Sequence, residues 1–303
     1  MNHQQKQAMT QRRTVLIGAA AAAMANTWPA LAQPTAKVWR IAYLDYGSRQ
    51  SMVDAGRMTA LMQGRAGFGY VEGRNFVFDA RYADGQVERL DTFAAELVAR
   101  KGLAATLARP GGNVTGLSSG GAETVQKLVE LLIVAVPKIK RVAVLTNPAN
   151  VRSADDVVQL LAALRTKNRE ALPVRARTPQ EIEQAFATMV RERAEGVVMP
   201  IDGFMLQQRG QIAALALKHR LPSIYPTQNY PEAGGLMSYG ADITDNFRRA
   251  GIFVDKIFKG AKPGDLPFEQ PTRYALVLNR KTADALGIKI GNELLLRADR
   301  VIE

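Results

Sequence analysis

The sequence predicts an α/β protein with two lobes, each a parallel sheet flanked by helices. Short apolar runs alternate with amphipathic helical segments along the chain, which is the order typical of parallel sheets covered by helices. A stretch of turn-forming residues, 109–118, separates two such series: Pro110 ends a helical run, and Gly111 and Gly112 permit a tight turn. We interpret this stretch as the crossing between the lobes.

Residues 1–32 have the features of an export leader. A polar segment containing Arg12 and Arg13 precedes an apolar run over residues 15–25, and Ala30-Leu31-Ala32 matches a small-residue cleavage pattern. The apolar run is shorter than the roughly 20 residues that span a bilayer. The paired arginines favour the twin-arginine route, although ordinary secretory leaders also tolerate them. We therefore predict a signal peptide over residues 1–32 and a periplasmic mature chain.

The first lobe is predicted over residues 33–116 together with 241–270. Its sequence alternates strand and helix, and the helix after the second strand has Leu90, Phe93 and Leu97 at helical spacing on one face. The predicted elements are a strand (38–44), a helix (52–62), a strand (76–82) and an amphipathic helix (90–98).

The second lobe is predicted over residues 117–240 together with 271–303. Thr178-Pro179-Gln180-Glu181 reads as a capping box, and Asp242 caps a helix that Gly260 ends. The predicted strands are 141–146, 172–177, 196–201, 222–225, 236–239 and 272–279. The predicted helices of this lobe are 125–134, 154–164, 179–190, 204–219 and 282–287, before a tail over 294–302. The helix over 242–259 falls within the bounds of the first lobe.

Several motifs in order resemble one protein family over nearly the whole mature chain. They are Leu-Ala-Arg-Pro-Gly-Gly-Asn-Val-Thr-Gly (107–116), Arg-Val-Ala-Val-Leu with Asn-Pro-Ala-Asn (141–150), His-Arg-Leu-Pro-Ser-Ile-Tyr (219–225), and the segments 232–240 and 254–263. This set resembles ABC-transporter substrate-binding proteins related to the tryptophan or aromatic amino-acid binding type, which have the type I periplasmic-binding fold. The resemblance implies a monomeric solute-binding subunit that docks on an ABC permease in the inner membrane.

The same resemblance implies that the helix over 242–259 returns to the first lobe, and that the ligand is an amino acid or related carboxylate held between the lobes. An aromatic group on the ligand is compatible with it. The resemblance gives no catalytic activity and no cofactor.

The first lobe departs from the family pattern near Lys101, Gly102 and Leu103. One helical run passes there into another, whereas parallel topology requires a strand between successive helices. About 30 residues, one βα repeat, are missing relative to the family. We predict an internal deletion that removes strands from this lobe. The alternative is that Gly102 only kinks a helix in a naturally small lobe. If the lobe is shortened, an alternative function follows: a truncated family member that no longer binds ligand.

Candidate ligand-binding residues follow from the rule that parallel sheets bind ligands at the carboxyl ends of their strands. In this role Ser and Asn would donate to a carboxylate, Asp202 would accept from an ammonium group, and the tyrosines would stack on an apolar group. The alternatives are a helix cap for Asp202, a turn for Asn147 and core packing for the tyrosines. The candidates are Tyr46, Gly47, Ser48, Ser118, Ser119, Asn147, Asp202, Tyr225 and Tyr239.

A serine hydrolase is the enzyme alternative. Gly116-Leu117-Ser118-Ser119-Gly120 matches the G-x-S-x-G nucleophile pattern, and Asp202 and His219 follow in the order an α/β-hydrolase uses. His219, however, is expected at the end of a helix, at the opposite edge of the sheet from Ser118. The sequence therefore favours a binding protein over an enzyme.

Composition excludes further classes. The 303 residues contain no cysteine, which removes disulfides, thiolate metal sites and a lipoprotein leader, and His219 is the only histidine after the leader. The formal charge of +12 falls to +9 without Lys6, Arg12 and Arg13, and the remaining basic residues are scattered. This pattern favours a solvated basic surface over a nucleic-acid groove. A transcription regulator would need a DNA-binding headpiece where the leader stands.

Overall fold

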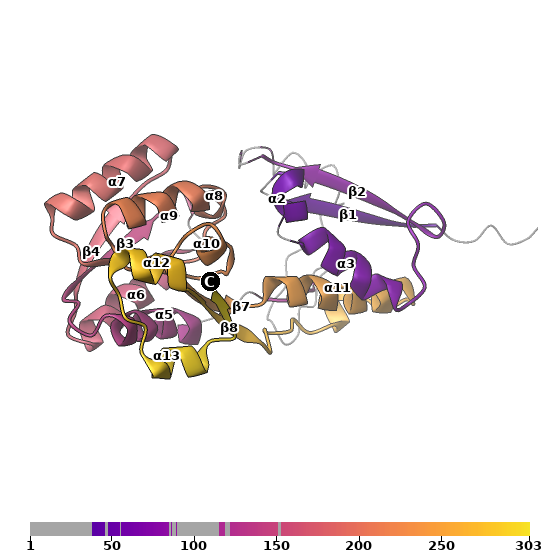
Figure 1. Ribbon diagram of the computed structural model, residues 1–303. Helices are drawn as coiled ribbons and strands as arrows, with labels where there is room; N and C mark the ends of the chain where they lie inside the picture. The colour runs from indigo at the N-terminus through magenta and orange to yellow at the C-terminus, as the bar shows by residue number, and fades with distance from the viewer. Residues whose placement is uncertain are drawn as a thin grey trace, which may run out of the picture. The chain divides into compact units, whose positions relative to one another are not determined.

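The computed structural model describes residues 38–45, 48–54, 56–84, 86, 89, 115–118, 122–150 and 153–303 (Figure 1). The predicted leader, the helix over 90–98, the junction at residues 101–103 and most of the crossing stretch lie outside these residues. Within the described part of the chain, no helix has the length and apolar character needed to cross a membrane.

A two-stranded parallel sheet contains β1 (Trp39–Asp45) and β2 (Phe76–Tyr82), paired along their whole length from Trp39↔Phe76 to Asp45↔Tyr82. Both strands lie where the apolar runs predict them. The helical run predicted over 52–62 is instead two helices, α2 (Arg49–Asp54) and α3 (Arg57–Ala66). The chain changes direction between them at Gly56, whose φ of +65° lies in the left-handed region that glycine adopts without strain.

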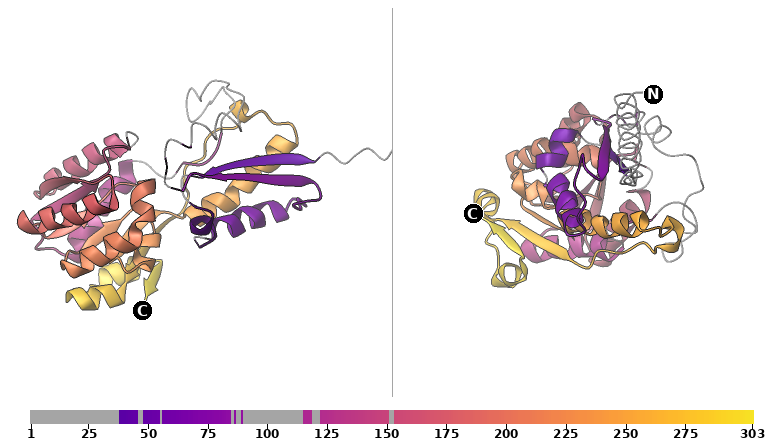
Figure 2. Two further views of the ribbon diagram at one scale, coloured as in Figure 1. Left: turned by 90° about the horizontal axis from the view of Figure 1, so that it is seen from above. Right: turned by 90° about the vertical axis from the view of Figure 1, so that its right-hand side faces the viewer.

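Helix α11 (Ile243–Phe258) comes from far along the chain and packs against α3 (Figures 1 and 2). It begins as predicted, because the Asp245 N–H donates to Asp242 Oδ1 at 3.1 Å, and Gly260 follows its end with φ +101°. The two helix backbones touch: a Cβ atom on Gly64 would lie 1.9 Å from the Arg248 carbonyl oxygen. Glycine at this position permits the close crossing.

An aromatic and ionic cluster fixes the far end of α11 against β1 and the segment after α3. The rings of Trp39 and Phe258 stack with centroids 4.4 Å apart. The Tyr70 hydroxyl donates to Asp255 Oδ1 at 3.1 Å, and Lys259 Nζ donates to Asp255 Oδ2 at 2.9 Å. These contacts join segments separated by about two-thirds of the chain.

The larger sheet has seven strands in the order β4-β3-β5-β6-β7-β8-β9. Its strands are β3 (Arg141–Thr146), β4 (Glu170–Arg175), β5 (Gly196–Val198), β6 (Ser223–Tyr225), β7 (Met237–Ala241), β8 (Tyr274–Asn279) and β9 (Arg300–Ile302). All neighbours are parallel except β7 and β8, so the predicted parallel sheet is confirmed, with one antiparallel pair that the sequence did not indicate. The segment containing α11 leaves the sheet after Ala241 and returns beside it at Tyr274, so β8 must run back along β7.

Helices cover both faces of this sheet (Figures 1 and 2). One apolar cluster joins the sheet to α5 (Ala122–Ala135), α6 (Ala154–Thr166), α12 (Arg280–Leu286) and α13 (Asn292–Arg297). The other joins it to α7 (Pro179–Arg191), α8 (Gly203–Gln207), α9 (Arg209–Lys218) and α10 (Asn229–Glu232). The helix predicted over 204–219 is divided into α8 and α9 at Gln208, and α10 and β9 were not predicted. The N-cap predicted at Thr178 is confirmed, since its Oγ1 accepts from the Glu181 N–H at 3.1 Å.

Candidate functional site

Two loops meet at the carboxyl ends of the adjacent strands β3 and β5. Asn147 and Asn150 lie in the loop after β3, and Asp202 lies in the loop after β5. Asp202 is buried, with only 6% of its surface exposed. Asp202 Oδ1 accepts from the Met205 N–H at 2.8 Å and caps α8. Asp202 Oδ2 accepts from Asn150 Nδ2 at 2.8 Å and from Asn147 Nδ2 at 3.3 Å. One carboxylate therefore caps a helix and joins both loops.

Asn147 is also engaged through its other amide atom. Its Oδ1 accepts from the Ala149 N–H at 3.0 Å, which closes a turn around Pro148. The structure thus brings together two predicted site residues, Asn147 and Asp202, and in this arrangement both make the turn and helix-cap contacts that the sequence left as alternatives. Their roles as ligand contacts stay predictions.

A pair of stacked tyrosines lies on the α7–α10 face of the sheet. The rings of Tyr225, at the end of β6, and Tyr230, on α10, are parallel within 2°, with centroids 4.3 Å apart. Both are buried, at 0% and 1% exposure. Burial raises the pKa of both hydroxyls, and the charge of Asp202 adds to the effect at Tyr230. Tyr225 thus presents its ring to the core, and Tyr230, which the sequence did not nominate, lies within the electrostatic reach of Asp202.

Tyr239 belongs to the other face of the sheet. Its ring stacks on Tyr274 with centroids 5.9 Å apart and packs against the apolar cluster beneath α5 and α13. Tyr225, on the neighbouring strand, belongs to the opposite cluster and pairs in register with Ser238. The structure therefore does not bring Tyr239 and Tyr225 together.

The two predicted serines in the described residues occupy separate loops. The Ser118 N–H donates to the Glu269 carbonyl at 2.9 Å, and the Ser118 carbonyl accepts from Asn246 Nδ2 at 3.1 Å. Ser48 precedes α2, and its carbonyl accepts from the Met52 N–H at 3.2 Å. The other three candidates, Tyr46, Gly47 and Ser119, lie outside the described residues.

The hydrolase alternative gains no support from the contacts of its members. The oxygens of Asp202 accept from Met205, Asn147 and Asn150, whereas the His219 ring stacks near Phe186 with centroids 6.3 Å apart. No hydrogen bond found among the described residues joins Ser118, Asp202 and His219 into a relay. Within the same residues, no group of three His, Asp or Glu side chains could hold a metal ion.

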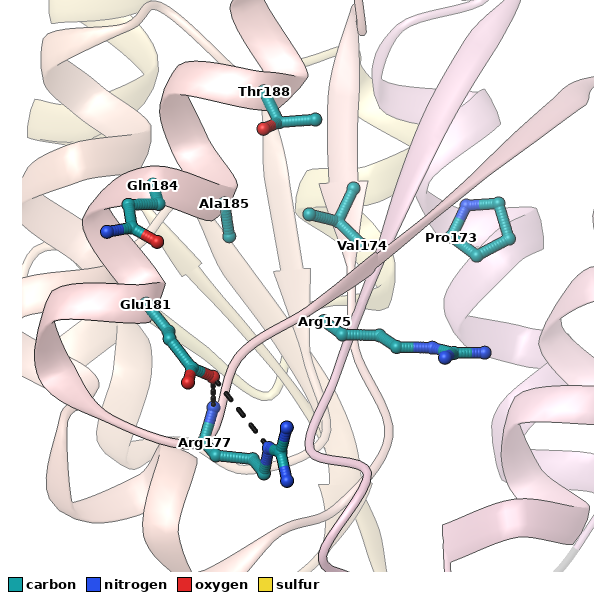
Figure 3. Close-up of a pocket in the computed structure, with 8 residues that line it drawn as sticks. All are labelled: Pro173, Val174, Arg175, Arg177, Glu181, Gln184, Ala185 and Thr188. Atoms are coloured by element: carbon teal, nitrogen blue, oxygen red, sulfur yellow. Dashed lines mark hydrogen bonds and ion pairs between the residues drawn. The ribbon is translucent and has the colours of Figure 1, made fainter.

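Two surface hollows lie away from these residues. One, of about 560 Å³, lies between the edge strand β4 and α7, where Glu181 accepts from the Arg177 backbone N–H at 2.7 Å (Figure 3). The other, of about 440 Å³, lies between β2 and α3 and includes Arg49 and Tyr82. Neither is lined by a predicted site residue, so neither identifies the ligand site.

The sheet order, the helices on both faces and the polar loops at the carboxyl edge define a periplasmic-binding-protein type I fold, and solved structures share it. A conserved domain protein from Vibrio cholerae matches with a TM-score of 0.79 at 24% identity, over 88% of this chain and 99% of that one. The ABC domain from Streptococcus pneumonia in complex with L-Trp matches with a TM-score of 0.80 at 23% identity, over 88% and 100%.

Residues 66–302 match the family model described as ABC transporter substrate binding protein, and the chain belongs to that family. The predicted resemblance is confirmed. A tyrosine-binding protein of Clostridioides difficile (strain R20291) is 26% identical over 188 residues, which are 62% of this chain and 54% of that protein. The chain thus spans about half the length of this curated relative.

Proposed function

We propose that this substrate-binding protein is exported and delivers an aromatic amino acid, or a closely related small carboxylate, to an ABC importer. The observation that carries the proposal is the convergence of Asn147, Asn150 and Asp202 at the carboxyl ends of β3 and β5, where open parallel sheets bind ligands. Two similar proteins support the ligand class, since one is named for tyrosine and the other was solved with L-Trp.

In this proposal the ligand lies between two lobes. The first lobe comprises residues 33–116 and 241–270, and the second comprises 117–240 and 271–303. Ligand binding closes the lobes, and the closed form docks as a monomer on a permease in the inner membrane. The leader over residues 1–32 directs export to the periplasm. The protein needs no cofactor and performs no reaction.

The proposed ligand contacts are loop residues with complementary chemistry. Serine hydroxyls and backbone N–H groups donate to the ligand carboxylate, and tyrosine side chains contact its apolar part. The proposed contacts are Tyr46, Gly47, Ser48, Ser118, Ser119, Asn147, Tyr225 and Tyr239. Asp202, which the sequence predicts with them, accepts a hydrogen bond from Asn147 at the same edge of the sheet.

A thermal-shift screen of the mature chain from Gln33 tests the proposal. A ligand that binds only the folded state stabilises it by about 2.7 kcal/mol at 100 times its Kd. We expect L-tyrosine or L-tryptophan to raise the melting temperature, and L-glutamate, purines and galactose to leave it unchanged. A shift by a purine or a sugar alone would overturn the ligand class. A cooperative melt that no compound shifts would overturn binding and favour a chain that has lost its ligand.

A further inference from the structure

We propose that Asp202 is a positioning residue, which holds the loop after β3 in place for the ligand and does not itself bind the ligand's ammonium group. This inference rests on the proposed function, because the ligand is expected at this edge of the sheet. It assigns to Asp202 and Asn150 a joint role: together they hold Asn147 and Asn150, after β3, against the loop after β5.

The oxygens of Asp202 are already committed. A carboxylate has about four acceptor positions, and three are used: one by the Met205 N–H and two by the side-chain amides of Asn150 and Asn147. With the residue only 6% exposed, little of the carboxylate is open to a ligand. Hydrogen bonds to an ionised carboxylate are stronger than neutral ones, so displacing them for an ammonium group would be costly.

Asn150 is also held by hydrogen bonds to its neighbours in the chain, in addition to its contact with Asp202. The Asn150 N–H donates to the Asn147 carbonyl at 3.1 Å, and the Asn150 carbonyl accepts from both the N–H and the Oγ of Ser153, at 3.2 and 2.9 Å. Ser153 is 4% exposed and immediately precedes α6. The contact between Asn150 and Asp202 is therefore linked by hydrogen bonds to Asn147 on one side and to Ser153, just before α6, on the other.

The geometry also explains why a carboxylate is needed. Both amide groups donate to the same oxygen, Oδ2, while Oδ1 serves the helix. In Asp202→Asn, the remaining oxygen can still cap α8, because asparagine is a good N-cap. Its NH2 group would then face two donors. This substitution should release the loop after β3 while it leaves the helix start intact.

The test measures L-tyrosine affinity by calorimetry in the full mature chain and in Asp202→Asn, Asn150→Ala and the double variant. If Asp202 acts through Asn150, each single variant weakens binding about tenfold, corresponding to the loss of about one hydrogen bond, and the double variant is no worse than either. The reciprocal exchange Asp202→Asn/Asn150→Asp restores most of the affinity, since an amide again donates to a carboxylate. Near-normal affinity in Asn150→Ala with a large loss in Asp202→Asn would overturn the proposal and show a direct ligand contact.

Hydrogen exchange without ligand separates failure of this inference from failure of the proposed function. In Asp202→Asn the Asn150 and Ser153 amides should exchange faster, with the Met205 amide still protected. Thr178→Ala is the control, because it removes a helix cap that joins no second loop. Unchanged exchange at Asn150 and Ser153 would overturn the positioning role, whether or not L-tyrosine binds. A wild-type chain that binds no amino acid would overturn the proposed function alone.

Discussion

The two sheets of this protein are packed very differently. In the seven-stranded sheet, β5 and β6 are buried at every residue and β3 at every residue but its first. Apolar clusters cover both of its faces. In the two-stranded sheet, no residue of β1 is buried, and Phe76 is the only buried residue of β2. Strand burial thus stabilises the larger sheet far more than the smaller one.

The smaller sheet depends instead on a helix supplied by the distant part of the chain. Burial of apolar surface contributes about 25 cal/mol per Å², and β1 and β2 bury little of it. The contacts that compensate involve α11: its backbone crossing with α3 at Gly64, its stacking of Phe258 on Trp39, and the hydrogen bond from Tyr70 to Asp255. These contacts link the smaller sheet to a helix that lies more than 160 residues further along the chain than β2.

The smaller unit, made of β1, β2, α2, α3 and α11, also carries a buried charge. Arg65 is 1% exposed, and its guanidinium lies 4.2 Å from the centroid of the Phe76 ring. Burial lowers the pKa of this arginine. Its Nε donates to the Leu61 carbonyl at 3.3 Å, and the Phe78 ring lies 5.6 Å away, so a cation is held among aromatic rings here, whereas apolar clusters cover the larger sheet.

The largest expected loss of stability is in the larger unit, which consists of the seven-stranded sheet and the helices that cover it. Phe186→Ala removes a fully buried ring from the cluster between the sheet and α7, and we expect it to lower the free energy of unfolding by about 3–5 kcal/mol. Urea denaturation followed by far-UV circular dichroism measures this. A loss below about 1 kcal/mol would show that this cluster does not dominate stability.

Gly64→Ala tests the crossing of α3 and α11 in the smaller unit. The new Cβ would meet the Arg248 carbonyl oxygen at 1.9 Å, so we expect a loss of about 1–3 kcal/mol, as for overpacking. Trp39 fluorescence reports the change, because the chain's other tryptophan, Trp28, lies in the predicted leader. Gly210→Ala, on α9 with nothing within 4 Å of its added Cβ, is the matched control and should be neutral or slightly stabilising. Equal changes in stability in both variants would show that the close crossing of α3 and α11 does not stabilise this unit.

Tyr70→Phe tests one hydrogen bond within the same unit. The variant keeps the ring edge against Phe258 and removes the donor to Asp255. We expect the free energy of unfolding of this unit to decrease by about 1 kcal/mol. The transition followed by Trp39 fluorescence should then occur at lower denaturant concentration, while the circular dichroism transition of the larger unit stays unchanged. Coincident shifts of both signals would show that the two regions unfold together.

Alkaline pH should weaken the same cluster by a smaller amount. The pKa of Tyr70 is raised from 10.0 by burial and its bond to Asp255, and that of Lys259 is raised from 10.5 by its bond to Asp255. The protonated forms are therefore favoured by folding, and their contribution, complete below pH 10, is lost as pH rises through the folded pKa values. The denaturant midpoint of the unfolding transition followed by Trp39 fluorescence should therefore decrease above pH 10. The decrease should be smaller in Tyr70→Phe. Higher stability at alkaline pH would contradict this assignment.

The sequence predicted several strands of six or seven residues closely, whereas it missed the shortest elements and the breaks within two predicted helices. The bounds of β2 and β3 match the apolar runs over 76–82 and 141–146, since a strand of that length carries its own pattern. The four-residue α10 and the three-residue β9 have too little periodicity to detect. The reversal of β8 depends on where the chain returns from α11, which no local pattern encodes.

The candidate site shows the same division. The edge rule for parallel strands nominates both Asn147 and Asp202 as site residues, and in the structure a hydrogen bond joins them. That Asn150 would share the Asp202 carboxylate, and that Tyr230 would stack on Tyr225, depends on side-chain packing between loops. Residue type and order alone do not specify such pairings.

Native-state hydrogen exchange of the mature chain tests the contrast between the sheets most directly. We expect the amides of β3, β5 and β6 to exchange only through global unfolding, and those of β1 and β2 to exchange through a smaller opening that Gly64→Ala makes easier. Equal protection of β1 and β3, in the wild type and in Gly64→Ala, would contradict the account that the smaller sheet depends on α11 for its stability.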